Sequence, residues 1–560
     1  MQDTFKEYLN EIIEYIKEEK PDKVTLSKKK IKLCSKYHLK HMPNDIKILM
    51  SAPSKEVKHI EQFLSIKPVR TISGVSVVAI MTKPLKCPGT CIYCPGGVNS
   101  FYGDTPKSYT GQEPAARRAA RNHFDSYLQI FNRLEHYIVS GHAPDKVELI
   151  VMGATFPAFD KDYQEEFIYY AFKAMNDFSD LFFNKKGKFN YPKFKEFFEL
   201  PTENFGDKER TKKIQKKLLK IKEKSALKKE QERNETSKIR CIALCIETRP
   251  DYGMLEHGNQ MLKLGCTRVE LGIQSVYEDV LKEVHRGHTV KDTITSIKTL
   301  KDLGLKVAGH YMPGLPLTNL KRDLEGMKQL FSNEDFKPDM LKIYPTMVSK
   351  GTVLYDKYKK KEFKPLTTEQ AAKLIVEFKK HVPGYCRIMR IQRDVPTQQW
   401  KAGVSLTNFR QYLFQNYDVK CNCIRCREPR GRKINWKNIK IKTNEYKASR
   451  GTEFFISAED GNILIGFIRM RFPSEQLRKE ITKKTALIRE LHVYGTATAL
   501  GKEGLVQHKG IGKQLLKEAE SIAKQHNKNK IVITSGIGVR PYYYKLNYKK
   551  EGPYVSKTLK

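Results

Sequence analysis

Three cysteines lie close together in one short segment of the chain, Cys87, Cys91 and Cys94. Thiolates are ligands for zinc and for iron–sulfur clusters. Three of them on a tight loop can hold three irons of a four-iron cluster and leave the fourth iron open to a small molecule. A ferredoxin cluster or a structural zinc ion takes four protein ligands instead. The spacing therefore favours a cluster with one open iron, and a zinc loop whose fourth ligand lies elsewhere is the alternative.

A second triplet, Cys421, Cys423 and Cys426, is even tighter. Its short, Arg-rich loop favours zinc, and Cys386 is a candidate fourth ligand. Three reduced thiols are the alternative. The chain has eleven cysteines and a polar N-terminus without a secretion signal, so metal binding is favoured over disulfides and a cytoplasmic location is expected.

The chain is long and strongly basic. Its 560 residues exceed one ordinary core, so two or more domains are expected. The formal charge of +40, from 103 basic and 63 acidic residues, favours a polyanionic partner. A Lys-rich surface that is merely solvated is the alternative. No stretch approaches the roughly 20 apolar residues of a membrane span, so no membrane partner is expected.

Strands alternate with helices in the middle of the chain. Six runs rich in β-branched and aliphatic residues predict strands at 75–81, 147–152, 242–247, 268–274, 305–310 and 340–344. This alternation predicts a parallel sheet in a full or partial barrel, with the chemistry at the carboxyl ends of the strands. A basic insertion at 180–240 interrupts the pattern, and its residues Ile214, Leu218 and Ile221 mark one apolar face of a helix.

The two ends of the chain differ from its middle. Residues 1–70 are predicted to form a small basic helical module, which either docks onto the protein or contacts nucleic acid. Residues 438–560 predict an α+β domain, with a strand pair around a turn at 459–462 and a long strand at 486–493. A loop containing Gln507, Gly510 and Gly512 then opens an amphipathic helix. Backbone N–H groups at such a helix N-terminus suit a pyrophosphate.

These motifs resemble known families. The first triplet, with an aromatic residue before its last cysteine, resembles the signature of the radical S-adenosylmethionine (SAM) enzymes, and the C-terminal domain resembles the GNAT acetyltransferases. Both halves in one chain resemble the catalytic subunits of Elongator, a family of tRNA wobble-uridine modification enzymes, in the archaeal stand-alone form. The resemblance runs from about residue 70 to 560, and its literal matches lie at 91–97, 108–114, 247–252, 272–277, 285–289, 342–346, 490–495 and 552–554.

The resemblance implies an α/β architecture in four parts. Residues 1–70 would be the basic helical module and would contact tRNA. A partial TIM-type radical SAM barrel would occupy 71–345, including the insertion at 180–240. A small metal-binding linker with the zinc-type cysteine triplet would follow at 346–437, and an α+β GNAT acetyltransferase domain at 438–560.

The resemblance also implies roles for single residues. Cys87, Cys91 and Cys94 would ligate a 4Fe–4S cluster whose open iron binds SAM. The SAM-binding positions would be Gly153 and Thr155, in a turn that has Ala154 where the family usually has a second glycine, with Glu247 and Gln274. The acetyl-CoA positions would be Lys146, Glu490, Leu491, His492, Val493, Gln507, Gly510, Ile511, Gly512, Lys513 and Tyr543. With the three cluster cysteines, Lys146, Tyr542 and Tyr543 would be catalytic.

The implied reaction joins two groups that are hard to activate. The methyl group of acetyl-CoA is too weakly acidic for an ordinary side-chain base, and carbon 5 of uridine is a poor acyl acceptor. A 5′-deoxyadenosyl radical would abstract a hydrogen atom from the methyl group, and the carbon radical would add to the uridine. Hydrolysis of the thioester would then leave 5-carboxymethyluridine in the anticodon stem-loop of tRNA. The protein would position the substrates and exclude water.

The RNA would need a basic channel to reach such a site. Arg387, Arg390, Arg393 and Lys401 surround Trp400 in the sequence and could line it, although such a mixture is also common on ordinary surfaces. Accessory protein subunits are possible but not required by the sequence.

Two other functions remain open. One is a protein lysine acetyltransferase that uses the GNAT domain directly, with Glu490 as the general base and the iron–sulfur cluster as a structural element. The other is a tRNA-binding scaffold with vestigial metal loops, which the intact cysteines and the intact loop from Gln507 to Gly512 argue against.

Overall fold

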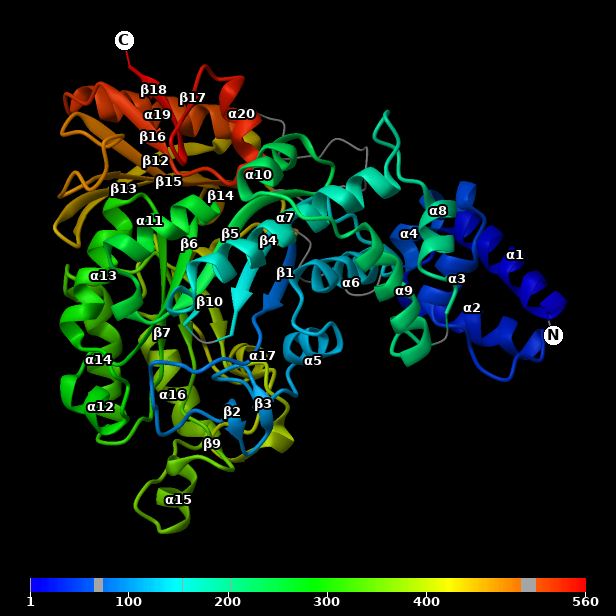
Figure 1. The fold of residues 1–560 in the computed structure, drawn as a ribbon, viewed down its shortest axis with the longest axis horizontal. Helices are drawn as coiled ribbons and strands as arrows, with labels where there is room; N and C mark the ends of the chain where they lie inside the picture. Colours follow the sequence, from blue (N-terminus) through cyan, green and yellow to red (C-terminus); the bar gives the residue numbers. More distant parts are fainter. Residues whose placement is uncertain (1, 65–73, 154, 203, 495–509, 560) are drawn as a thin grey trace.

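The computed structural model describes residues 2–64, 74–153, 155–202, 204–494 and 510–559 (Figure 1). Its largest element is an all-parallel sheet in the strand order β1-β4-β5-β6-β7-β8-β10. The strands are β1 (Ser76–Met81), β4 (Lys146–Met152), β5 (Arg240–Thr248), β6 (Arg268–Gln274), β7 (Lys306–Tyr311), β8 (Met340–Ile343) and β10 (Arg387–Ile391). Among the described strands, β1 and β10 do not pair with each other, so the sheet is an open, partial barrel.

Six of these strands agree with the predicted ones, and the seventh extends the sheet beyond residue 345, where we expected the barrel to end. Strand β10 pairs in parallel with β8 although it lies in the segment predicted to be a linker. Its sequence places Arg387 and Arg390 among three aliphatic residues, which weakens the hydrophobic signal of a barrel strand. The partial radical SAM barrel predicted from the sequence is confirmed.

Helices cover the outer face of the parallel sheet. They are α6 (Ser126–Val139), α7 (Lys161–Phe182), α11 (Leu255–Leu264), α12 (Glu278–Glu283), α13 (Val290–Asp302), α14 (Leu320–Ser332) and α16 (Thr368–Lys379). Helix α5 (Pro114–Arg121) instead packs against Met81 of the edge strand β1 through Ala116 and Ala119. None of the helices in the described part of the chain is long and apolar enough to cross a membrane.

The inner face of the sheet is not filled by side chains. In β4, Val147, Leu149 and Val151 are buried on the face that the helices cover, whereas the alternate residues from Lys146 to Met152 are partly exposed. The inward residues of a closed TIM barrel pack into a solid core. Here they line a cavity.

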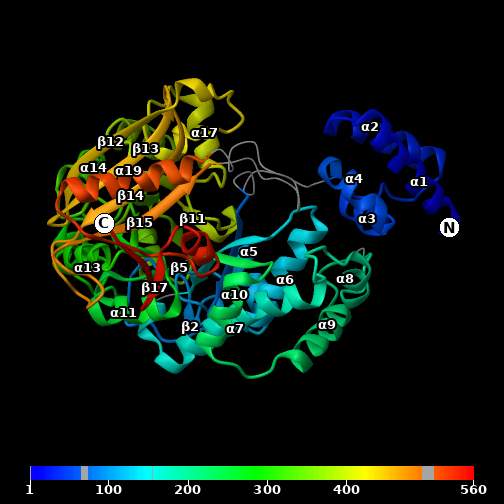
Figure 2. The same cartoon turned by 90° about the horizontal axis from the view of Figure 1, so that it is seen from above.

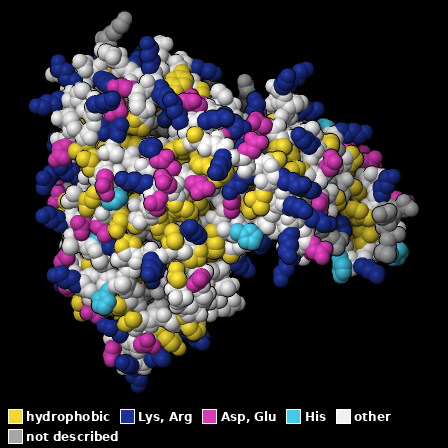
Figure 3. Space-filling view, in the orientation of Figure 1, with side chains coloured by type: hydrophobic (Ala, Val, Ile, Leu, Met, Phe, Trp, Pro, Cys, Tyr) yellow, Lys and Arg dark blue, Asp and Glu magenta, His cyan; other side chains and the backbone are white. Residues whose placement is uncertain are grey.

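The N-terminal helices stand beside the barrel, on the side of α6 and α8 (Figure 2). They are α1 (Gln2–Glu19), α2 (Lys23–Lys36), α3 (Asp45–Ser51) and α4 (Ser54–Leu64), and the insertion forms α8 (Tyr191–Phe197), α9 (Lys208–Ile221) and α10 (Leu227–Thr236). The hydroxyl of Tyr191 donates a 3.2 Å hydrogen bond to Glu61 and so joins the two groups. Ile214 and Leu218 are buried on the apolar face predicted for α9. Lys and Arg side chains spread over both the main body and these helices (Figure 3).

The C-terminal domain is built on a second seven-stranded sheet, in the order β12-β13-β14-β15-β16-β18-β17. Its elements are β12 (Lys440–Ala448), β13 (Gly451–Asp460), β14 (Ile463–Phe472), β15 (Thr485–Val493), α19 (Ile511–Gln525), β16 (Lys530–Ile533), α20 (Arg540–Tyr544), β17 (Lys549–Glu551) and β18 (Tyr554–Thr558). The predicted strand pair is β13 and β14, joined at Gly461, whose φ of +56° suits glycine. Strand β12 was missed because most of its side chains are exposed and polar.

Short elements complete the fold. They are the hairpin β2 (Gly97–Ser100) and β3 (Gly103–Thr105), the pair β9 (Val348–Ser349) and β11 (Trp400–Ala402), and the helices α15 (Val353–Lys359), α17 (Phe409–Asn416) and α18 (Ile424–Arg427). Five 3₁₀ turns lie at Phe156–Ala158, Pro250–Tyr252, Thr397–Gln399, Trp436–Asn438 and Ile537–Val539.

Buried ion pairs join the barrel to the C-terminal domain. Asp339, directly before β8, is fully buried and accepts hydrogen bonds of 2.6 and 2.7 Å from the guanidinium of Arg489 on β15. The same guanidinium donates to Glu453 at 2.7 Å. Burial alone would raise the pKa of Asp339, but Arg489 and Lys301 outweigh it and hold the pKa well below its usual value. The carboxylate therefore stays charged and depends on its partners.

We expect Asp339→Ala to destabilise the protein by about 3–5 kcal/mol, because it leaves the charge of Arg489 buried without its main partner. Chemical denaturation followed by circular dichroism measures this loss. The exposed pair of Glu369 and Lys373 supplies the control, and Glu369→Ala should leave the free energy of unfolding nearly unchanged. Equal effects of the two substitutions would contradict this account of the interface.

Candidate active site

One cavity of about 1720 Å³ runs from the barrel to the C-terminal domain. Its lining includes the three cysteines of the first triplet, on the loop after β1, and both Tyr542 and Tyr543 on α20. Strand β15 contributes Glu490, Leu491, His492 and Val493. Residues that the sequence assigned to two separate cofactors therefore share one space.

The surroundings of the first triplet are polar. Ser108 donates its backbone N–H to the sulfur of Cys94 at 3.2 Å, and the hydroxyl of Thr155 lies 3.7 Å from the sulfur of Cys87. The guanidinium of Arg286 lies 3.5 Å from the sulfur of Cys91. Each cysteine therefore has a polar neighbour that can stabilise negative charge on sulfur.

The charge of Arg286 favours the thiolate form of Cys91. Burial alone would raise the pKa of this thiol, but the nearby guanidinium outweighs burial and the net pKa lies below its usual value. Burial, with the charge of Cys91, raises the pKa of Cys94. Since the thiolate is the form that binds a metal, Cys91 is prepared for ligation and Cys94 would lose its proton on binding.

The residues present fit an iron–sulfur cluster with a small ligand. Among the described residues, the second triplet has its sulfurs within 4.8 Å of one another, and the first triplet does not. Sulfurs around a multi-iron cluster must stand further apart than those around a single ion. Beside them, Nη1 of Arg249 and Oε1 of Gln274 are buried and make no hydrogen bond within the described chain. Buried polar atoms without a partner in the protein are suited to form hydrogen bonds with a bound polar molecule.

The predicted SAM-binding residues lie at the carboxyl ends of their strands, as expected. Glu247 is the last residue but one of β5 and accepts a 3.1 Å hydrogen bond from the hydroxyl of Tyr109. Gln274 ends β6 with a φ of +67°, which is rare for a residue other than glycine. Gly153 follows β4 with a φ of +110°, and its carbonyl accepts a hydrogen bond from Thr82. Glu247, Gln274 and Thr155 line the cavity.

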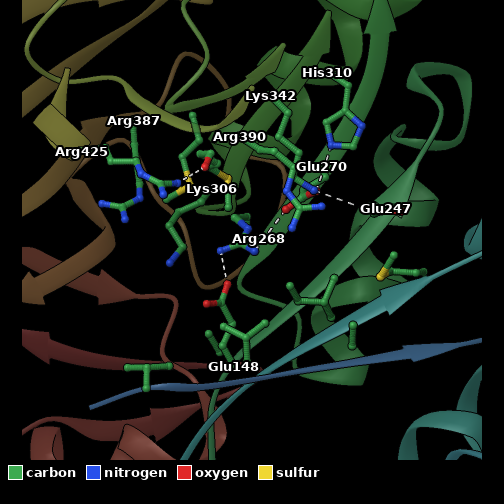
Figure 4. A pocket seen from close by; sticks show the side chains of 18 of the residues that line it. Glu148, Glu247, Arg268, Glu270, Lys306, His310, Lys342, Arg387, Arg390 and Arg425 are labelled. Carbon is green, nitrogen blue, oxygen red and sulfur yellow. Dashed lines mark hydrogen bonds and ion pairs between the residues drawn. The ribbon is translucent and has the colours of Figure 1, made fainter. Parts of the chain in front are cut away.

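A chain of charged side chains crosses the barrel interior (Figure 4). Arg268 pairs with both Glu148 and Glu270, and Glu270 also pairs with Lys342 and lies 2.9 Å from Nε2 of His310. We had assigned no role to these residues. The sequence feature that could have identified them is a charged residue at alternate positions of an otherwise apolar strand. Such charged residues are typically paired or functional.

Strand β15 extends beyond one of its neighbours. In the described chain, β16 pairs with β15 only from Thr485 to Ile488, while β15 continues along β14 to Val493. The stretch beyond Ile488 carries the four predicted acetyl-CoA residues. Helix α19 begins beside it, since a side chain at Gly512 would come within 3.1 Å of Tyr542 and 3.7 Å of Val493.

Of the other predicted acetyl-CoA residues that the structure describes, Lys146 and Tyr543 line the cavity, whereas Gly510 to Lys513 do not. Gly510 caps α19 with a φ of +78°, and Ile511, Gly512 and Lys513 form the first helical turn, where backbone N–H groups favour an anion. Lys146 lies across the cavity, at the start of β4. Gln507 lies outside the described residues.

Glu490 is held by two cations. Its carboxylate accepts a 2.8 Å hydrogen bond from Arg469 on β14 and pairs with Lys306 on β7 at 3.3 Å. Burial alone would raise its pKa, but Lys306 and Arg469 outweigh burial and lower the pKa to about 2. A carboxylate with this pKa is a weak base near neutral pH.

Part of the predicted basic channel lines the cavity. Arg387, Arg390 and Arg393 are lining residues, whereas Trp400 and Lys401 are not among the described residues that line it. The structure adds arginines from α17 and α18, Arg410 and Arg425. Burial lowers the pKa of Arg425 to about 9, helped by the positive charges around it.

The second triplet forms a compact thiol group. The sulfurs of Cys421, Cys423 and Cys426 lie within 4.8 Å of one another. Cys386, which the structure also describes, is not in this group, although its carbonyl accepts a hydrogen bond from Ile424 at 2.9 Å. Lys379 contacts the group, with Nζ 3.8 Å from the sulfur of Cys426. The structure therefore does not bring the predicted fourth ligand to the site.

Family models match most of the chain. An ELP3 N-terminal domain model matches residues 1–72, the radical SAM superfamily 204–329, a radical SAM C-terminal domain 338–417, and the GNAT acetyltransferase family 420–548. A relative from Methanocaldococcus infernus, named tRNA uridine(34) acetyltransferase, is 44% identical over 98% of both chains. The chain belongs to the Elongator protein 3 family.

Other members of this family are similar to the chain over nearly its whole length. Elongator complex protein 3 of Saccharomyces cerevisiae is 38% identical over 94% of this chain and 91% of its own length. The human protein is 36% identical over 96% and 94%. A solved structure of Methanocaldococcus infernus Elp3 without residues 1–46 has a TM-score of 0.71 and 41% identity, covering 87% of this chain and all of that one. The combination of a radical SAM barrel with a GNAT domain is thus confirmed.

We expect Cys91→Ala to prevent cluster assembly, since it removes one of three iron ligands. Anaerobic reconstitution followed by iron analysis and absorption spectroscopy measures this. Arg286→Gln keeps all three ligands and should lower the affinity for the cluster about 10- to 100-fold, because it removes a neighbour that favours the thiolate. Cys34→Ala, in the N-terminal module, is the matched control and should bind as much iron as the unchanged protein. Full iron content in Cys91→Ala would exclude this loop as the cluster site.

Proposed function

We propose that this protein is a tRNA wobble-uridine modification enzyme that uses acetyl-CoA and SAM to form 5-carboxymethyluridine. The observation that carries the proposal is the single cavity lined by both the cysteine loop and strand β15. A shared cavity lets the acetyl group held by one domain reach the chemistry supplied by the other. The family relationship supports it, since relatives of 44% identity are named tRNA uridine(34) acetyltransferase. A cytoplasmic location stays a prediction.

Each wall of the cavity has a task in this proposal. Cys87, Cys91 and Cys94 hold the 4Fe–4S cluster, which together with SAM supplies hydrogen-atom abstraction, a chemistry that belongs to the cofactor. The backbone of β15 from Glu490 to Val493 binds acetyl-CoA, and the N-terminus of α19 accepts its pyrophosphate.

The arginines that line the cavity outside the barrel receive the RNA. Arg390 and Arg393 bind the phosphates of the anticodon loop, while the barrel walls keep water from the reacting carbon. The triplet Cys421, Cys423 and Cys426 holds a structural zinc ion outside the cavity, between β10 and the C-terminal domain. Its three sulfurs supply three of the four donors that zinc takes.

A protein lysine acetyltransferase is the alternative, and the surroundings of Glu490 count against it. Direct transfer needs a general base to deprotonate the amine, typically with a pKa near the working pH. Glu490, the carboxylate on β15, has its pKa lowered to about 2 by Lys306 and Arg469. Its charge is already engaged by two cations, so it is poorly suited to accept a proton.

The first test is product formation. Anaerobically reconstituted protein is incubated with SAM, acetyl-CoA, a reductant and unmodified tRNA, and the digested tRNA is analysed by mass spectrometry. We expect 5-carboxymethyluridine that depends on SAM and on Cys91. The Cys34→Ala variant, with its intact cluster loop, should form as much product as the unchanged protein.

A different outcome would favour the alternative. Unmodified tRNA, together with acetylated lysines on a protein substrate in reactions that lack SAM, would overturn the proposal. The variant Glu490→Gln sharpens the comparison. A loss of lysine acetylation by about 10²- to 10⁴-fold would identify Glu490 as a general base despite its ion pairs.

A further inference from the structure

The barrel interior joins the two ends of the cavity. Because all seven strands are parallel, their amino ends form one mouth and their carboxyl ends the other. Lys146 and Lys306 lie at the amino mouth, and Thr155 and Gln274 at the carboxyl mouth; all four line the same cavity. Lys306 pairs with Glu490 of β15 at 3.3 Å, so the amino mouth opens onto the predicted acetyl-CoA strand.

The passage has one apolar wall, built from small or slender side chains. Val77 and Ala79 of β1, Ile150 of β4 and Ala243 of β5 line the cavity and are partly exposed. Inward positions of a closed barrel usually carry bulky branched residues that fill it. Alanines at these positions leave the space open for something other than the protein's own side chains.

The charged side chains that line the passage beside this apolar part are neutralised by one another. Glu148 pairs with Arg268, and Glu270 pairs with Lys342 (Figure 4). Paired charges of both signs neither attract nor hold a polyanion, in contrast to the arginines outside the barrel. Within the described chain, Nε of Arg268 is buried and makes no hydrogen bond, so the wall retains a donor for a neutral acceptor such as an amide carbonyl.

The length and the polarity of the passage define its occupant. Strand β4 has seven residues, and a rise of about 3.3 Å per residue gives a passage of about 20 Å. An occupant must be slender, extended and uncharged, with carbonyl groups for the polar wall and methylene or methyl groups for the apolar wall. The pantetheine arm of an acyl-CoA, a flexible chain with two amides that ends in a thioester, has this chemistry.

We propose that the barrel interior is a binding site for the acyl-pantetheine arm, which enters between Lys146 and Lys306 and carries the acetyl group towards the cysteine loop. The inference rests on the proposed function for the identity of the acyl group, and it explains how acetyl-CoA bound at β15 reaches the other end of the barrel. The nucleotide half of CoA stays outside, at the N-terminus of α19.

Photolabelling tests the path without requiring turnover. The full-length protein is irradiated with an acyl-CoA analogue that carries a diazirine in its acyl group, and the labelled peptides are identified by mass spectrometry. We expect label on the barrel strands, on peptides that contain Ile150 or Glu270. Label confined to the C-terminal domain would overturn the proposal.

A bulky substitution in the middle of the passage provides the second test. Ala243 lies opposite Glu148 in the strand register, so Ala243→Phe should block the arm half-way. We expect it to abolish label on the barrel and to lower formation of the modified uridine about a hundredfold or more. Ala243→Ser, which leaves the space open, is the matched control and should retain both.

Two further measurements keep the outcomes separate. Titration with 3′-phospho-ADP, the nucleotide half of CoA, should give the same affinity for Ala243→Phe and Ala243→Ser. The iron content of both variants should match that of the unchanged protein. If Ala243→Phe differs in either measurement, Ala79→Phe takes its place. Barrel label with no tRNA product would refute the proposed reaction and keep the passage. Product formation by a plugged, folded variant would refute the passage and keep the reaction.

Discussion

The common direction of the barrel strands is the constraint on which the rest of the structure depends. Since all seven strands of the barrel sheet run the same way, their carboxyl ends meet at one rim, where the cysteine loop follows β1. The amino ends meet at the opposite rim, where Asp339 receives Arg489 from the C-terminal domain. The cysteine loop and strand β15, which lie far apart in the sequence, thus line opposite ends of one cavity that runs through the barrel.

Charge inside the barrel keeps that space open. Removing an ion from water costs several kcal/mol, and only well-placed partners offset the cost. Glu270 is fully buried and contacts Arg268, His310 and Lys342. Such a group cannot be replaced one residue at a time by the aliphatic packing of an ordinary barrel, because each single loss leaves a partner unpaired. The paired charges of the barrel interior therefore prevent the aliphatic packing that would fill the cavity.

The sequence predicts what short-range patterns control. Spacing alone identified the cysteine loop, and runs of β-branched residues identified six barrel strands. Strand β10 was missed because arginines interrupt its apolar pattern. Arg286 was assigned no role because 195 residues separate it from Cys91, and only the folded barrel brings them together. Cys386 was chosen from residue type alone, and the structure keeps its sulfur out of the thiol group.

The position of Glu490 shows how the two halves divide their tasks. Strand β15 pairs with β16 only as far as Ile488, whereas it stays paired with β14 up to Val493. Arg469 of β14 and Lys306 of β7 hold the carboxylate from both domains. A free carboxylate here could act as a base for acyl transfer, but one held in this way fixes the strand against the mouth of the barrel. This arrangement supports our proposal that the C-terminal domain presents an acyl group and that the reaction takes place in the barrel.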